Sequence, residues 1–123
     1  MAARDAHLEQ ATTNRQFAEH LVRDRSDDPA AMQWAVTAAF YSALHCLQAH
    51  LLVHGMHPRT HLTRDRLLSD PAYGVPDDVY AAYEALRQRS EGARYRMQRF
   101  TADRVRQEIL AGYLAKVMAF VGL

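Results

Sequence analysis

The side chains best able to do chemistry in this sequence are histidines, arginines and hydroxyls at helical spacing. Tyr41, His45 and Gln48 are separated by four and then three residues, so they share one face of a helix. The segment around them is otherwise apolar, and buried polar groups need hydrogen-bonding partners. A neighbouring element must therefore supply those partners, and an imidazole in such a setting is suited to general acid–base chemistry.

A second row of polar side chains on one helix face, or polar stripe, could supply hydrogen-bonding partners for the first. Tyr83, Arg87, Ser90 and Arg94 follow one another at steps of four, three and four residues, again on one helix face. An arginine presents a planar fork of donors that suits phosphate or carboxylate. If the two stripes face each other, they form either a hydrogen-bond network that fixes helix register or a cleft that binds an anion.

The charge of the chain is uneven, although its formal net charge is only +1. Residues 87–106 contain seven arginines against Glu91 and Asp103, a local charge of about +5. Such a patch attracts polyanions, nucleic acid first among them. The alternative is an ordinary solvated face, because Lys116 is the only lysine of the chain and arginine is its default surface cation.

Five of the seven histidines lie between residues 45 and 61. His50 and His54 are four residues apart and are followed by His57 and His61, a spacing that could hold a transition metal. No cysteine and no acid on the same face completes a familiar metal signature. We therefore expect exposed histidines near a helix end, where the carbonyl dipole favours them, and no metal or other cofactor.

Other features exclude several classes of protein. Gly-rich phosphate loops, paired catalytic carboxylates and Ser-His-Asp patterns are absent from the sequence. The single cysteine, Cys46, allows no internal disulfide, so we expect a cytoplasmic protein. We also expect no association with a membrane, because no apolar run approaches the ~20 residues needed to cross a bilayer.

The sequence predicts that five helices position these residues, and it shows no convincing strand. The caps are Asp27 or Asp28 before Pro29, then Thr60 and Thr101. We predict one all-α domain over residues 1–123, an up-and-down bundle of about five helices. The predicted helices cover about residues 4–24, 29–54, 61–70, 77–99 and 102–121.

Two stretches, "WAVTAAFYSALHCLQAHLLVHGMHPRTHLTRDRL" and "YAAYEALRQRSEGARYRMQRFT", resemble the HEPN superfamily of small all-α proteins. The similarity is to stand-alone bacterial members and covers about residues 30–101. Those members carry a Tyr-x-x-x-His helix, a His-x-x-Arg after a loop, and Ser-x-x-x-Arg-Tyr on the fourth helix. The matching residues are Tyr41 with His45, His61 with Arg64, and Ser90 with Arg94 and Tyr95.

The resemblance implies a helical bundle, commonly a homodimer, that acts in RNA cleavage or nucleotide binding. It also implies a toxin–antitoxin or defence system, with a cognate antitoxin or a nucleotidyltransferase-type protein as partner. In metal-independent cleavage the ribose 2′-OH attacks the adjacent phosphate, which requires a base, an acid and a cation. The candidates are His45 and His61 as acid and base, Arg64, Arg87 and Arg94 as phosphate ligands, and Tyr41, Ser90 and Tyr95 as orienting groups.

The sequence departs from the family in one place. Nuclease members use Arg-x(4–6)-His late in the fold, whereas the last histidine here is His61. The only literal match, Arg15 to His20, lies in the first helix and is taken as chance. Two interpretations follow: an endoribonuclease with a relocated histidine, or a non-catalytic module that binds a nucleotide, an RNA or a partner protein.

Overall fold

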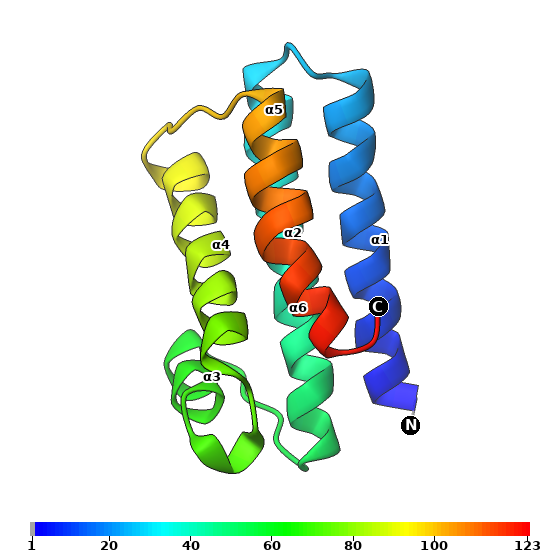
Figure 1. Ribbon diagram of the computed structural model, residues 1–123, viewed down its shortest axis with the longest axis vertical. Coiled ribbons are helices and arrows are strands. Elements are labelled where there is room, and N and C mark those ends of the chain that lie inside the picture. The colour runs from blue at the N-terminus through cyan, green and yellow to red at the C-terminus, as the bar shows by residue number, and fades with distance from the viewer. Residues whose placement is uncertain (1) are drawn as a thin grey trace.

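The chain folds as an all-α bundle in the computed structural model, which describes residues 2–123, and no strand occurs in that range. The long helical segments run side by side, and a short helix lies at one end of the bundle near α4 (Figure 1). The predicted fold class is therefore confirmed. The elements are α1 (Ala2–Asp24), α2 (Pro29–Val53), α3 (His61–Leu68), η1 (Pro71–Tyr73), α4 (Asp77–Tyr95), and a last helix made of α5 (Ala102–Arg104), η2 (Val105–Leu114) and α6 (Ala115–Phe120).

Side-chain caps start three of these elements where the sequence predicts them. The Asp28 carboxylate accepts hydrogen bonds from the first backbone N–H groups of α2, with Pro29 in the first helical position. Thr60 and Thr101 cap α3 and α5 in the same way. These caps matter for the site because they fix where α2 and α3 begin, and thus which side chains face each other.

Helix α2 is the centre of the molecule and packs against α1, α4 and the last helix. Phe40, Leu47 and Leu51 on α2 are completely buried, as its nearly uniform apolar sequence predicts. By length and composition α2 could also cross a bilayer, which the sequence reasoning above did not anticipate. However, 67% of its most apolar window is buried inside the bundle, which is typical of a core helix.

Helix α4 is shorter than predicted. We expected it to continue to about Arg99, but it ends at Tyr95 and the chain then turns at Met97, whose φ is 55°. The backbone carbonyl of Gly92 accepts hydrogen bonds from the N–H groups of Arg96 and Gln98, which closes the helix end. The Gln98 side chain then folds back over Gly92, so this glycine contacts a returning loop.

The last helix contains a stretch of π-helix, η2, in which hydrogen bonds join residues five apart. The sequence predicts a regular 3.6-residue stripe for this segment. The residues that are fully buried are Val105, Ile109, Leu114 and Val117, so one step of the stripe is five residues long. The wider winding therefore shifts the buried face by one position in the middle of the helix.

Candidate functional site

The residues singled out from the sequence gather on one side of α2, together with parts of α1, α3 and α4. His50, on the opposite side of α2 at about half a helical turn from Tyr41, contacts Phe120 of the last helix. The side of α2 that carries Tyr41, His45 and Gln48 is therefore the one turned away from the last helix. We call the polar face the set Tyr41, His45, Gln48, His61, Arg64, Ser90, Arg94 and Tyr95, with His7 added by the structure.

Arg64 is the best-buried cation of the polar face, with 6% of its surface exposed. Its Nε donates to Oε1 of Gln48 at 3.1 Å, and the Gln48 amide donates in turn to the carbonyl of Pro58 at 3.2 Å. Its Nη1 lies 3.2 Å from Nδ1 of His61. Arginine is always a donor, so His61 Nδ1 accepts this bond and Nε2 is left as the free end of the ring.

His45 lies half-buried beside α1, where it meets a residue that the sequence reasoning missed. Its Nδ1 is 2.8 Å from Nδ1 of His7, so one of the two rings donates and the other accepts. Burial lowers the pKa of His45, and the nearby His7 and Arg64 lower it further. His7 lies in a different helix, and spacing along one helix carries no information about contacts with another.

His61 is the more exposed of the two candidate acid–base residues. Partial burial lowers its pKa, and the cations of Arg64 and Arg87 add to the effect. Both His45 and His61 therefore favour the neutral imidazole near neutral pH; the Arg64 guanidinium is in contact with the His61 ring, and its charge also lowers the pKa of His45. A neutral imidazole can take a proton at a ring nitrogen whose lone pair is free. In His61 the lone pair of Nδ1 accepts the Arg64 bond and the proton of the neutral ring lies on Nε2, so this ring acts as a base only when that bond is released.

A second cluster adjoins the first, one helical turn earlier on α2. Arg94 Nε donates to Oγ of the fully buried Ser90 at 3.1 Å, and Nη1 lies 3.4 Å from the Tyr41 hydroxyl and 3.2 Å from that of Tyr95. The guanidinium carbon also lies 5.7 Å and 4.9 Å from the two ring centroids. All of these partners are uncharged, so Arg94 keeps its full positive charge at the surface.

Arg87 has a different environment. It forms ion pairs with Asp65 of α3 and with Glu84 and Glu91 of its own helix, and the Asp65 contact raises its pKa. Its donors are directed at carboxylates and its charge is offset within the protein. Phosphate binding by Arg87 stays a prediction, whereas Arg94 has the environment that such a role requires.

The remaining arginines of the basic stretch divide in the same way. Arg89 and Arg104 both pair with Glu108, and this shared carboxylate links α4 to the last helix. Arg96 and Arg99 are exposed. The run of arginines thus serves packing at some positions and presents charge at others, which accounts for both interpretations drawn from the sequence.

Tyr83 lies behind the polar face and is also completely buried. Burial raises the pKa of its phenol to about 12, and the nearby Arg64 works against that increase. Its hydroxyl and Oδ1 of Asp65 are buried without a hydrogen-bond partner among the described residues. The sequence placed Tyr83 on the second stripe but assigned it no role.

The five histidines between residues 45 and 61 do not gather around one point that could hold a metal ion. His50 lies 2.6 Å from the carbonyl oxygen of Tyr73, and the His54 ring packs edge-on against the ring of Tyr73. Over residues 2–123 no group of three histidine, cysteine, aspartate or glutamate side chains is placed to hold a metal ion. The ring of His57 lies 6.3 Å from the ring of His7, measured between centroids.

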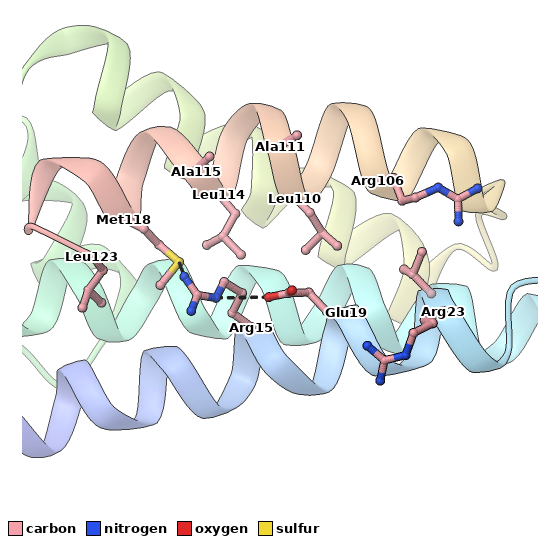
Figure 2. Close-up of a pocket in the computed structure, with 11 residues that line it drawn as sticks. Arg15, Glu19, Arg23, Arg106, Leu110, Ala111, Leu114, Ala115, Met118 and Leu123 are labelled. Carbon is pink, nitrogen blue, oxygen red and sulfur yellow. Dashed lines mark hydrogen bonds and ion pairs between the residues drawn. The ribbon is translucent and has the colours of Figure 1, made fainter.

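A separate groove of about 700 Å³ lies between α1 and the last helix (Figure 2). Leu110, Leu114 and Met118 form part of its apolar floor, and Figure 2 shows Arg15 paired with Glu19 in its middle. Much of one wall comes from the π-helical segment η2. The groove shares no residue with the polar face.

Comparison with known proteins adds no family to this description. No protein-family model matches the chain, and no curated protein matches it either.

Proposed function

We propose that the protein is an RNA-directed, HEPN-like domain of the cytoplasm that cleaves RNA without a metal ion, with the polar face as its active site. One observation carries the proposal: two imidazoles that favour the neutral form, His45 and His61, lie on one side of the bundle, and the charge of the Arg64 guanidinium lowers the pKa of both. Resemblance to the HEPN superfamily supports RNA as the substrate. It rests on Tyr41, His45, His61, Arg64, Ser90, Arg94 and Tyr95, all of which belong to the polar face.

The chemistry follows from the environment of each group. One imidazole removes the proton of a ribose 2′-OH, whose oxygen then bonds to the adjacent phosphorus. The bond from phosphorus to the leaving 5′-oxygen breaks, and the other imidazole, which must first take a proton from solvent because it favours the neutral form, gives that oxygen a proton. Arg94 meets the negative charge that develops on the phosphate. Tyr41, Ser90 and Tyr95 hold the Arg94 guanidinium in place.

The test is RNA cleavage in the presence of EDTA. We expect His45→Ala and His61→Ala each to lower the rate by about 10²-fold or more, and Arg94→Ala to lower it as well. The matched controls are His20→Ala and Arg66→Ala, which remove an exposed histidine and an exposed arginine away from these contacts. Circular dichroism of every variant shows whether it is folded. Absence of cleavage by pure wild-type protein would contradict the proposal.

A second function is favoured by the burial of Arg64. Its donors are directed at Gln48 and His61, as in a network that holds α2 and α3 together. In that case the domain binds a nucleotide, an RNA or a partner protein through Arg94 and has no nuclease activity. Binding of a non-cleavable RNA together with absence of cleavage would support this alternative.

The proposal also includes the assembly that the resemblance implies. We expect a homodimer, with about twice the 14.0 kDa mass of the chain. A cognate antitoxin or a nucleotidyltransferase-type protein is the expected partner.

A further inference from the structure

Two large aromatic side chains are exposed next to Arg94, where α2 and α4 lie side by side. Trp34 of α2 is 59% exposed and Tyr95 of α4 is 72% exposed. Burial of an aromatic ring of this size is strongly favourable, because it removes a large apolar area from water. Exposure of both rings at one place therefore indicates a surface that binds something flat and apolar.

The two rings line a cavity of about 380 Å³. Thr37 of α2 and Ala93 of α4, which also line it, are small and buried, so the space between the two helices is open to a ligand. The volume lies near the lower end of the range of about 300–1,000 Å³ that is typical of small-molecule sites. A single planar ring system suits this space better than an extended ligand.

Arg94 belongs to this cavity and to the polar face at the same time. Its hydrogen-bond partners are uncharged, so it can neutralise an anion at the mouth of the cavity. The cavity and its surroundings thus offer aromatic rings on two helices and a free cation beside them. An unpaired nucleotide has the complementary chemistry, a flat base and a phosphate a few ångströms away.

We propose that the Trp34–Tyr95 cavity is a stacking pocket for one unpaired base of single-stranded RNA, with the adjoining phosphate held by Arg94. This assignment rests on the proposed function for the identity of the ligand as RNA, but it does not require cleavage. Stacking tolerates any base, so the pocket holds an unpaired nucleotide next to Arg94 of the polar face without reading its sequence. It also explains why Tyr95 is exposed although it contacts Arg94.

The chain contains one tryptophan, so the intrinsic fluorescence of Trp34 reports directly on this cavity. The probe is a short 2′-O-methyl oligoadenylate, which cannot be cleaved because it lacks the attacking hydroxyl, compared with an abasic oligomer of the same backbone. We expect saturable quenching by the oligoadenylate and none by the abasic oligomer. Equal quenching by both would overturn the pocket, because the backbone alone would then account for binding.

Two variants of Tyr95 distinguish the contribution of its aromatic ring to binding from that of its hydroxyl. Tyr95→Ala removes a stacking surface and is expected to weaken binding about tenfold or more, whereas Tyr95→Phe keeps the ring, loses only the hydroxyl that accepts from Arg94, and is expected to weaken binding less than Tyr95→Ala. Phe17→Ala, which removes an exposed ring on α1, is the matched control and is expected to bind like wild type. An unchanged affinity in Tyr95→Ala would overturn the proposal.

The same measurements distinguish the stacking pocket from two other hypotheses, the proposed nuclease activity and an interface between two copies of the chain. Quenching without cleavage of ordinary RNA would support the pocket and contradict the nuclease. Cleavage without quenching would do the reverse. Light scattering gives the third comparison: if Tyr95→Ala breaks a dimer and the emission of Trp34 depends on protein concentration, the two aromatic rings form an interface between copies of the chain and the pocket is overturned.

Discussion

At the scale of single residues, Arg64 and Arg94 show how burial and partners divide the work of similar side chains. Arg64 is sealed against Gln48 and His61, so its charge acts mainly on groups inside the protein. Arg94 has neutral partners and a surface position, so its charge is available to a ligand. Carboxylates offset the charge of Arg87, which has glutamates three residues before it and four residues after it as well as Asp65 of α3.

The contact between His7 and His45 predicts that the free energy of unfolding depends on pH. Burial and neighbouring groups lower the pKa of both rings in the folded protein, while the unfolded chain titrates near the ordinary value of about 6.5. Below that pH the unfolded state binds more protons than the folded state, so the free energy of unfolding falls as the pH is lowered. We expect His7→Asn to flatten this dependence, because His45 then loses its nearest competing ring.

Melting temperatures between about pH 7.5 and about pH 5.5 test this expectation. The control is His20→Asn, which changes an exposed histidine of the same helix. His61 also has a lowered pKa, so part of the slope remains in every variant. A slope as steep in His7→Asn as in wild type would show that the paired rings contribute nothing.

Part of this arrangement could be predicted from the sequence. Helical spacing placed Tyr41, His45 and Gln48 on one face, and the structure gives each a hydrogen-bonding partner. Only Gln48 is buried as expected, because Tyr41 is exposed and His45 is half-buried. The identity of those partners could not be predicted, because a period along one helix does not give the rotation of the next helix. His7 and Asp65 were missed for that reason, whereas Glu84 and Glu91 lie on the same helix as Arg87 at pairing distance along the sequence.

At the scale of elements, the helix starts were predictable and one helix end was not. Asp28, Thr60 and Thr101 are side chains whose capping chemistry is local, so their positions can be predicted from sequence alone. Helix α4 ends without glycine or proline after Tyr95. The reversal at Met97 depends instead on the loop packing back against Gly92, which is a contact between residues that fold together.

Met97 provides a test of that helix end. Its φ of 55° is a left-handed conformation that costs an ordinary residue roughly 1–2 kcal/mol, and its side chain is 83% exposed, so little packing is lost on removing it. We expect Met97→Gly to raise the free energy of unfolding by about 1 kcal/mol, measured by urea denaturation. The comparison is Gln88→Gly, an exposed position inside α4, which should lower it by about the same amount. Equal losses in both variants would contradict the assigned turn.

At the scale of the whole molecule, two separate cavities lie on opposite sides of α2. One side carries the polar face and the Trp34–Tyr95 cavity, and the other meets the last helix, next to which the groove of Figure 2 opens against α1. Since the groove and the polar face share no residue, occupation of one does not block the other. The all-α architecture was predictable because each helix carries its own apolar stripe, whereas neither cavity could be, because each lies between two helices.

The π-helical stretch of the last helix predicts that one residue can be deleted there without loss of the fold. Its buried residues Val105, Ile109, Leu114 and Val117 are spaced by four, five and three. Deleting Gly112, which is exposed, turns these steps into four, four and three, the spacing that a regular α-helix buries on one face. We therefore expect the deletion to be tolerated, with helix content and cooperative melting retained in circular dichroism.

Deleting Ala38 from α2 is the opposite case, because no wide step is available there to absorb it. Every later side chain of α2 would rotate by about 100° relative to the core, and we expect loss of cooperative unfolding. Failure of the Gly112 deletion to fold would contradict the reasoning. The last helix thus carries one residue more than its core requires, and natural or engineered loss of a single codon there should leave the bundle intact while closing part of the groove beside α1.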